Sequence, residues 1–414
     1  MVSSDRQIFM FLKNKHAHKS NYPEDLKAIL NIASAKKSEL LLSHWDKISL
    51  NTPLWNLPQL ASESGVGKVS IKDESKRSEL ASFKALGAPN ALVKLIIRHY
   101  PNFSLKRVLT GYYRKWLSDF TVISATDGNH GRALAAAAQS IGCPCIIVLH
   151  AQVSLERERA IAAYGASIVR VKGNYDQSVE HAKTLATSNQ WHVVSDTSYE
   201  GYDIIPTDVM QGYGVMVAEI LTQLNQNNAP AITHVFLQAG VGGLPAGVVS
   251  FLWQHFQKHR PIIIIVEPVQ ADCLYQSALN QVASEATGNV DSVMAGLACG
   301  KTSPLAWRFL QNSVDYFMLI SDTQAVNAMK TLAVGNDKDI PIIAGESGAA
   351  GVAALRALNP SQKKAMNITE QSHLLLFNTE GATAPTLYKS LIDKEVCDIL
   401  ASQSNWLTQQ SMTD

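Results

Sequence analysis

The sequence has little of what would indicate a membrane or secreted protein. No apolar run approaches the roughly 20 residues that a membrane-spanning helix needs. The longest runs, such as residues 262–266, have the length of buried strands. Residues 1–15 mix charged with apolar side chains and lack the long apolar core of a signal peptide. We therefore expect a cytoplasmic protein with no membrane partner.

Cysteine is scarce and odd in number. The five cysteines argue against a disulfide framework. Cys143 and Cys145 have the wrong spacing for a usual zinc pair, and no second pair stands ready to complete a site. We expect no metal, and we interpret both residues as small apolar side chains at the start of a strand.

Neither sign of charge is in excess. The 36 basic and 35 acidic residues give a formal net charge of +1, so nothing favours nucleic acid as a partner. Residues 100–116 are locally basic without clear periodicity, which indicates a surface insertion. A chain of 414 residues exceeds one compact core and predicts two domains. We expect its partners to be a small molecule and a second copy of the chain.

Short, β-branched apolar runs alternate with helical stretches from about residue 70 to 380. This alternation predicts an α/β fold with mostly parallel, twisted sheets flanked by helices. The N-terminal 50 residues and the tail after about residue 395 are predicted to be helical or irregular additions. The predicted strands are residues 69–72, 121–124, 145–149, 167–171, 192–195, 234–238, 262–266, 315–320 and 373–377. The predicted helices include residues 132–141, 155–164, 175–188 and 214–224.

One lysine stands where a strand leads through a charged turn into a helix. The turn is Asp73-Glu74-Ser75-Lys76-Arg77, and Ser82-Phe83-Lys84 follows it. Ser82 is a candidate N-cap, which places Lys84 in the first turn of the helix. The partial positive charge of a helix N-terminus disfavours protonation of an amine there and attracts anions. Taken alone, the pattern is more typical of a solvated surface lysine.

Two glycine-containing loops follow predicted strands. In Asp127-Gly128-Asn129-His130-Gly131, the amide of Asn129 can donate to an anionic oxygen. Residues 239–247 form a glycine-rich loop that feeds a helix, which is typical of a phosphate cradle. A dinucleotide site would look similar, but no acidic residue stands about 20 residues further on.

Together these segments resemble the fold-type II enzymes that use pyridoxal phosphate (PLP), and among them most closely the diaminopropionate ammonia-lyases. The resemblance covers about residues 50 to 390 and includes Ser195-Asp196-Thr197, Val266-Glu267-Pro268 and Gly345-Glu346-Ser347-Gly348. It implies that Lys84 forms a Schiff base with PLP next to Phe83. It also implies that Asn129 binds the ring oxygen and Thr379 faces the pyridine nitrogen. The phosphate is assigned to Gly240, Val241, Gly242, Gly243 and Leu244.

The resemblance also implies an architecture and a state of assembly. We expect a large PLP-binding domain of residues 1–89 and 206–414, a small mobile domain of residues 90–205, and the site between them. The members of this branch are usually homodimers. Cys273 and Cys299 match a pair that can form a disulfide in the family, and we expect them to be mostly reduced in the cytoplasm.

The implied reaction is the α,β-elimination of 2,3-diaminopropionate to pyruvate and two ammonia molecules. Lys84 would take the α-proton of the L-substrate and Asp127 that of the D-substrate, while Asp196 would bind the second amino group. Asp127 and Asp196 could instead serve as structural caps. A threonine or serine dehydratase of the same fold is the alternative enzyme. A PLP-binding relative without turnover is the other alternative, and the altered segment 78–81 supports it.

Overall fold

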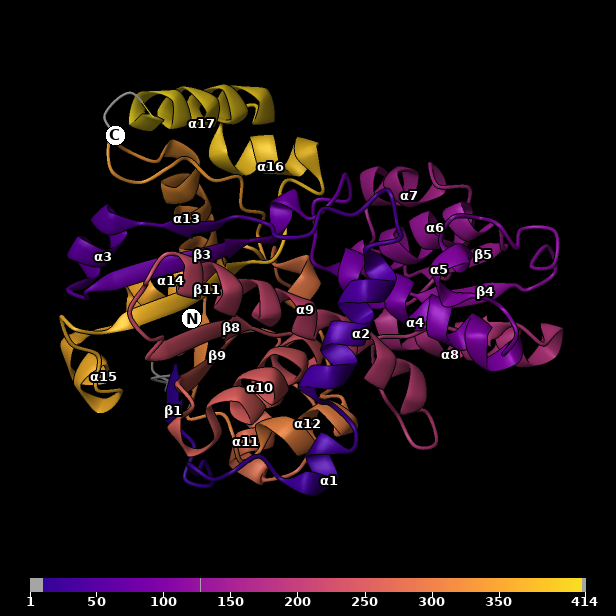
Figure 1. Ribbon diagram of the computed structural model, residues 1–414, viewed down its shortest axis with the longest axis horizontal. Helices are drawn as coiled ribbons and strands as arrows, with labels where there is room; N and C mark the ends of the chain where they lie inside the picture. Colours follow the sequence, from indigo (N-terminus) through magenta and orange to yellow (C-terminus); the bar gives the residue numbers. More distant parts are fainter. Residues whose placement is uncertain (1–9, 127, 412–414) are drawn as a thin grey trace, which may run out of the picture.

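The computed structural model describes residues 10–126 and 128–411. Two sheets form its frame, in the order β1-β10-β9-β8-β11-β3-β2 and β6-β5-β4-β7 (Figure 1). The edge strands β1 and β2 run antiparallel to their neighbours, and the remaining pairs are parallel. The predicted α/β fold with mostly parallel sheets is therefore confirmed. The strands are β1 (Phe11–Lys13), β2 (Leu54–Asn56), β3 (Lys68–Asp73), β4 (Val122–Ala125), β5 (Cys145–Leu149), β6 (Ser167–Arg170), β7 (His192–Val193), β8 (His234–Gln238), β9 (Ile262–Pro268), β10 (Tyr316–Ile320) and β11 (His373–Asn378).

Helices connect these strands and extend the chain at both ends. The α-helices are α1 (Glu24–Lys27), α2 (Ile32–Leu42), α3 (Pro58–Ser64), α4 (Lys84–His99), α5 (Leu105–Val108), α6 (Asn129–Ile141), α7 (Leu155–Ala162), α8 (Tyr175–Asn189), α9 (Ile204–Gln226), α10 (Gly243–Phe256), α11 (Cys273–Asn280), α12 (Pro304–Leu310), α13 (Asp322–Val334), α14 (Ala350–Ala357), α15 (Pro360–Ala365), α16 (Pro385–Ile392) and α17 (Val396–Ser411). Single 3₁₀ turns are η1 (Glu74–Lys76), η2 (Gln257–His259) and η3 (Ala295–Leu297). Strands β1 and β2 were not predicted, because each is only three residues long and is stabilised by pairing at a sheet edge.

The larger sheet is buried on both faces. Along β9, Ile263 and Ile265 belong to one hydrophobic core, which also contains residues of α9 and α10. Ile264 and Val266 belong to a second core, which contains residues of α13 and α14. Successive side chains of a strand point to opposite faces, so this alternation shows helices covering both sides.

The smaller sheet lies at the other end of the molecule, with α6, α7 and α8 beside it (Figure 1). It is also covered on both faces, since Ile123 packs against α8 while the preceding Val122 joins the core that contains the alanines of α6. The predicted domain boundaries, at residues 89/90 and 205/206, fall inside α4 and α9. The division into a large and a small mobile domain stays a prediction.

Helices α4 and α9 approach each other closely because glycines stand where they cross. A Cβ atom on Gly87 would lie 2.6 Å from the ring of Tyr213, and one on Gly212 would collide with the carbonyl oxygen of Leu86. This packing fixes the start of α4, where Lys84 is the first helical residue and its N–H donates to Ser82 Oγ at 3.3 Å. The N-cap of α4 is Phe83, one residue after the predicted Ser82, although Ser82 Oγ still accepts the N–H of Lys84.

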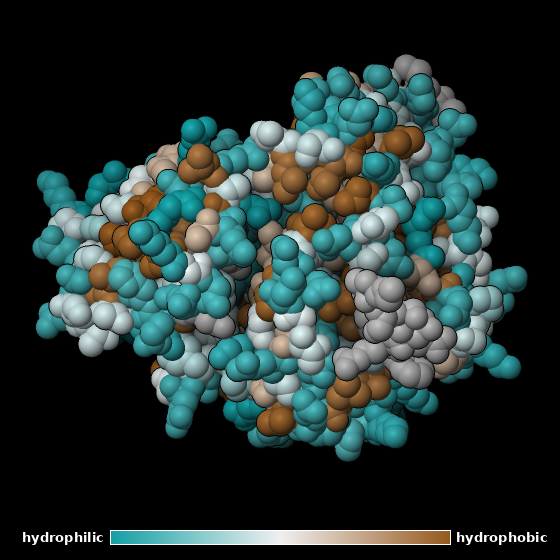
Figure 2. Space-filling view, turned by 180° about the vertical axis from the view of Figure 1, so that it is seen from behind, coloured by the Kyte–Doolittle hydropathy of each residue, from teal (hydrophilic) through white to brown (hydrophobic). Residues whose placement is uncertain are grey.

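Hydrophilic side chains predominate on the face seen in Figure 2, and hydrophobic ones form scattered patches on it. Among residues 10–126 and 128–411, no helix combines the length and the apolarity required to cross a bilayer.

A buried network of charged side chains links the turn before Lys84 to α9. The guanidinium of Arg77 donates to both oxygens of Glu219 at 2.6 and 2.7 Å and to both oxygens of Glu74 at 2.8 Å. Lys72 Nζ lies 2.7 Å from Glu219 Oε2, and all four side chains are fully buried. Two positive and two negative charges balance, so each buried charge has a partner.

We expect Arg77→Met to lower the free energy of unfolding by about 3–5 kcal/mol, because Glu74 and Glu219 would lose their shared buried partner. The exposed pair of Arg356 and Glu63, at 3.4 Å, offers a control, and Arg356→Met should cost less than about 1 kcal/mol. Urea unfolding of both variants checks the difference. Similar losses in the two would contradict this account of the network.

Candidate active site

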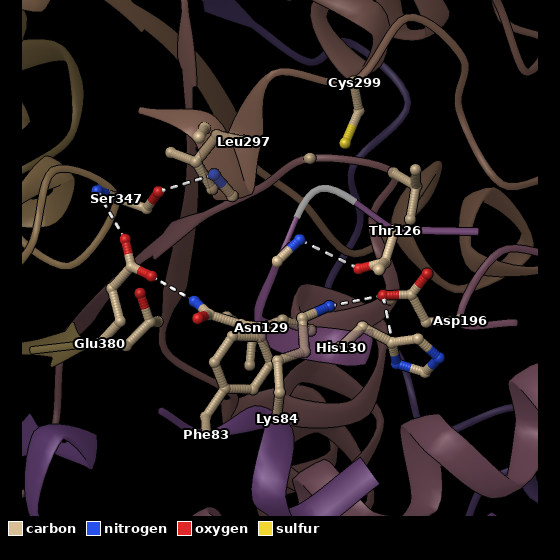
Figure 3. A pocket seen from close by; sticks show the side chains of 18 of the residues that line it. Phe83, Lys84, Thr126, Asn129, His130, Asp196, Leu297, Cys299, Ser347 and Glu380 are labelled. Carbon is tan, nitrogen blue, oxygen red and sulfur yellow. Dashed lines mark hydrogen bonds and ion pairs between the residues drawn. The ribbon is translucent and has the colours of Figure 1, made fainter. Parts of the chain in front are cut away.

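A cavity of about 940 Å³, counting the part open to solvent, lies where segments following both sheets meet. Strand ends, helix N-termini and loops contribute its walls, as expected for the carboxyl ends of parallel strands. Figure 3 shows Lys84, Asp196 and His130 on one side, and Asn129, Glu380 and Ser347 on the other. All of the described residues predicted for the site line this cavity. They are Phe83, Lys84, Asn129, Asp196, Gly240, Val241, Gly242, Gly243, Leu244 and Thr379.

The amine of Lys84 pairs with a carboxylate inside the cavity. Lys84 Nζ donates to Asp196 Oδ2 at 2.5 Å, and His130 Nδ1 lies 3.8 Å from the same oxygen. The other ring nitrogen of His130, Nε2, is 2.9 Å from the carbonyl oxygen of Val194, so Nε2 must carry a hydrogen. Three titratable groups therefore meet at one point of the site.

Burial and the contacts among these three groups shift the pKa of each of them. Burial lowers the pKa of Lys84, but the charge and hydrogen bond of Asp196, together with Tyr213 and Cys299, outweigh burial and raise that pKa above its ordinary value. Burial raises the pKa of Asp196, but interactions led by the charge of Lys84 more than reverse this, so the carboxylate stays ionised. Burial lowers the pKa of His130, which favours its neutral form. The pair is thus an ammonium and a carboxylate beside a neutral imidazole.

The glycine-rich loop turns the start of α10 toward the cavity. Gly242 has φ +101°, a left-handed conformation that L-residues rarely adopt, and α10 begins at the next residue. The first N–H groups of a helix have no acceptor within it, and the helix dipole adds partial positive charge. This end of the cavity is therefore suited to a phosphate group.

Asn129 is the first residue of α6, and its side-chain amide donates to Glu380 Oε2. The other oxygen of Glu380 accepts the backbone N–H of Ser347 at 3.2 Å, while Ser347 Oγ accepts the N–H of Gly296 at 3.1 Å. Glu380 therefore ties Asn129 to the loop that follows α13.

Thr379 has a hydroxyl hydrogen left for a partner in the cavity. Thr379 Oγ1 is one of four acceptors within 3.2 Å of Gln238 Nε2, and this contact requires no hydrogen from the hydroxyl. The hydroxyl can then donate to a neutral pyridine nitrogen.

Aromatic side chains form the wall next to Lys84. The rings of Phe83 and Tyr213 lie 4.8 Å apart, and Lys84 Nζ is 5.1 Å from the ring centre of Phe83. Burial raises the pKa of Tyr213 to about 12, so its hydroxyl is neutral.

Cys273 and Cys299 both lie beside Gly240. Cys273 is a buried free thiol whose Sγ is 3.5 Å from the carbonyl oxygen of Gly240, and burial raises its pKa. A Cβ atom on Gly240 would lie 2.6 Å from Cys299 Sγ. Cys143 and Cys145, by contrast, are buried at β5, and burial raises the pKa of each thiol.

Some predicted and observed site residues differ. Asp127 lies outside the described residues. His130 and Glu380 line the cavity but were not assigned a role from the sequence, although both stand in segments that carried the resemblance. Arg157 and Tyr175 also line it, and no local pattern marks them. They come from α7 and α8, helices that look like ordinary connections in the sequence.

A family profile described as pyridoxal-phosphate dependent enzyme matches residues 47–371. This chain belongs to that family. PLP is accordingly the cofactor of this PLP-dependent enzyme, as predicted, and the fold-type II architecture is confirmed.

Individual relatives agree with the family match. The diaminopropionate ammonia-lyase of Salmonella typhimurium is 35% identical over 353 residues, which cover 82% of this chain and 87% of the relative. The holo structure of the Escherichia coli diaminopropionate ammonia-lyase superimposes with a TM-score of 0.85 at 33% identity, covering 92% of this chain and 96% of that one. The same E. coli enzyme in complex with an aminoacrylate-PLP azomethine reaction intermediate gives a TM-score of 0.83, with the same identity and coverage.

The residues present in the PLP-dependent enzyme fit this cofactor. An amine stands in the cavity with the N-terminus of α10, and the amide of Asn129 and the hydroxyl of Thr379 lie in the same walls. The amine can condense with an aldehyde, and the other three groups can donate hydrogen bonds to a phosphate, a ring oxygen and a ring nitrogen, respectively. Within the described residues, no group of three or more His, Cys, Asp or Glu side chains is arranged to hold a metal ion.

A second buried carboxylate, Glu346, stands next to the site. Its Oε1 lies 3.6 Å from Arg157 Nη2, and its residue is 2% exposed. Burial and the charge of Glu380 raise the pKa of Glu346 to about 7 from an ordinary 4.5. Between these two values the folded protein holds a proton that the unfolded chain has released. The stabilisation that protonated Glu346 contributes is therefore fully present below about pH 4.5 and is lost as the pH rises from there through about 7.

We expect Glu346→Gln to remove this loss, because glutamine does not titrate. Relative to the unmodified protein, the variant should gain stability from pH 5 to pH 7, with a slope on the order of 1 kcal/mol per pH unit. Urea unfolding at pH 5, 6 and 7 measures the difference between the two proteins. A difference that does not change with pH would show that Glu346 does not titrate in this range.

Proposed function

We propose that this PLP-dependent enzyme eliminates ammonia from 2,3-diaminopropionate. The observation that carries the proposal is the Lys84–Asp196 ion pair, which stands in one cavity with the glycine turn and α10. An amine and a phosphate cradle in one cavity support PLP chemistry on an amino acid. The likeness to diaminopropionate ammonia-lyases along most of the chain supports the choice of substrate.

The cofactor, when bound, withdraws electrons from the α-carbon of the amino acid, which makes the α-proton acidic and the β-substituent a leaving group. Lys84 is proposed to hold the cofactor and to take the α-proton of the L-substrate. The adjacent Asp196 stabilises the protonated form of Lys84, so a proton accepted at Nζ is retained there. The β-amino group leaves as ammonia, and hydrolysis of the released enamine gives pyruvate and a second ammonia.

Other residues are proposed to bind and orient. The N–H groups of Gly240, Val241, Gly242, Gly243 and Leu244 would hold the phosphate. Asn129 would donate to the ring oxygen and Thr379 to the pyridine nitrogen, while Phe83 would pack beside the cofactor. A hydroxyl at position 379 leaves the pyridine less protonated than a carboxylate would, which favours elimination over transamination.

Asp196 is also proposed as the partner of the substrate's second amino group. Its carboxylate is ionised and lies within the cavity, and a negative charge there favours an ammonium group. Ammonia would leave the β-carbon after the proton has been removed from the α-carbon.

We expect the purified enzyme to release one pyruvate and two ammonia molecules from diaminopropionate. Lys84→Ala should abolish this activity and the absorbance of the lysine-bound cofactor near neutral pH, because no other amine is proposed to hold PLP. Coupled assays for pyruvate and ammonia with both enantiomers, together with an absorption spectrum, check both statements. Survival of colour and turnover in the variant would refute the assignment of Lys84.

We expect Asp127→Asn to reduce the rate with D-diaminopropionate at least tenfold more than the rate with the L-enantiomer. The asparagine cannot accept the α-proton that Lys84 cannot reach, and loss of a positioned base costs about 10²–10⁴-fold. Steady-state rates with each enantiomer measure the ratio. Equal losses would rule out a second base at this position and leave Asp127 a structural cap.

A threonine or serine dehydratase is the second enzyme to be tested in the same assay. This alternative would be supported if 2-oxobutyrate formed from threonine, or pyruvate from serine, faster than pyruvate formed from diaminopropionate. A protein that binds PLP but turns over none of these amino acids would be a relative without activity. The homodimer and the cytoplasmic location expected from the sequence stay predictions.

A further inference from the structure

Glu380 occupies a fixed place relative to Lys84. Ser82 and Glu380 form an antiparallel bridge, and the N–H of Phe83 donates to the carbonyl oxygen of Thr379 at 3.1 Å. The N–H of Gly381 donates to Ala81 at 2.9 Å. Backbone hydrogen bonds on both sides of Glu380 therefore attach it to the segment that carries the lysine.

The side chain of Glu380 points into the cavity and reaches Asn129 (Figure 3). It is 4% exposed, and its neighbours donate three hydrogen bonds to it, from Asn129 Nδ2, the Ser347 N–H and Thr383 Oγ1. All three donors are neutral, and within residues 10–126 and 128–411 no lysine, arginine or histidine forms an ion pair with Glu380. The carboxylate thus acts through hydrogen bonds rather than through a salt bridge.

A carboxylate only accepts hydrogen bonds, so it selects one of the two orientations of the Asn129 amide. The orientation with Nδ2 toward Glu380 is favoured, and the reverse would bring two oxygens together. Nδ2 carries two hydrogens, and Glu380 uses one of them. The second hydrogen of Nδ2 is then available to donate to another acceptor in the cavity.

We propose that Glu380 is a positioning residue for the cofactor. It holds the Asn129 carboxamide so that an N–H, and not the carbonyl oxygen, is available to the PLP ring oxygen, at a set distance from Lys84. Without Glu380 the carboxamide of Asn129 can rotate so that Oδ1 and Nδ2 exchange places, and Oδ1 would then repel an anionic ring oxygen. The inference rests on the contact between Asn129 and the ring oxygen in the proposed function.

A double-mutant cycle tests whether Glu380 acts through Asn129. Glu380→Ala and Asn129→Ala should each weaken PLP binding about tenfold, as expected for one hydrogen bond to a charged acceptor, and should shift the absorption band of bound PLP. The double variant should bind no more weakly than Asn129→Ala alone. Titration of the cofactor-free proteins with PLP, followed by absorbance, measures affinity and band position without any substrate.

Two further variants distinguish the positioning of Asn129 from the effect of the negative charge of Glu380 and from a general effect on folding. Glu380→Gln keeps an acceptor for Asn129 and should bind PLP more tightly than Glu380→Ala. Glu346→Gln removes a neighbouring buried carboxylate without touching Asn129, and it should leave the affinity within about twofold. If Glu380→Ala does not fold, the cycle is run with Glu380→Gln, whose smaller effect should likewise vanish when Asn129 is absent.

Independent losses, about a hundredfold in the double variant, would overturn the proposal and leave Glu380 a structural residue. An unchanged PLP band and affinity in Glu380→Ala would overturn it as well. Since the titration needs no turnover, failure of the elimination assay leaves this result standing. Failure of the cycle, in turn, leaves the proposed substrate untouched.

Discussion

The structure depends on four charged side chains that are buried together between α9 and the segment formed by β3 and η1. Lys72, Glu74, Arg77 and Glu219 would each be costly to bury alone, and they are stable only as a balanced set with close contacts. Because Glu219 belongs to α9, this set joins the strand before Lys84 to the helix against which α4 packs. The direction in which α4 begins, and so the position of its first amine, follows from that junction.

The cavity separates charge in a way that suits PLP and a diamine. The N-terminus of α10 supplies partial positive charge at the glycine turn, where the phosphate is proposed to lie. The carboxylates of Asp196 and Glu380 lie in the walls that hold Lys84 and Asn129. An anionic tail and a cationic amino group are therefore favoured at different places. A substrate with two amino groups and one carboxylate matches this distribution better than a hydroxy amino acid with a single ammonium.

Much of the frame was predictable from local patterns. The strands β5 and β8 have the predicted bounds, and the loops before α6 and α10 start helices as their glycines indicated. The turn Asp73-Glu74-Ser75-Lys76-Arg77, in contrast, reads as a charged surface turn. Glu74 and Arg77 are in fact fully buried, because the partner of Arg77, Glu219, stands 142 positions further along the chain. No local pattern in either segment shows that contact.

The sequence by itself determined the units that depend on adjacent residues, which are the parallel strands, the lysine at a helix start and the glycine turn before α10. Local side-chain patterns and the steric limits of glycine indicate these units, although the strands are completed by hydrogen bonds to distant strands. Only the tertiary structure decided which side chains act together: Lys84 with Asp196 across 112 positions, and Asn129 with Glu380 across 251. Such contacts depend on how two sheets and their helices pack, and packing is a property of distant residues taken together.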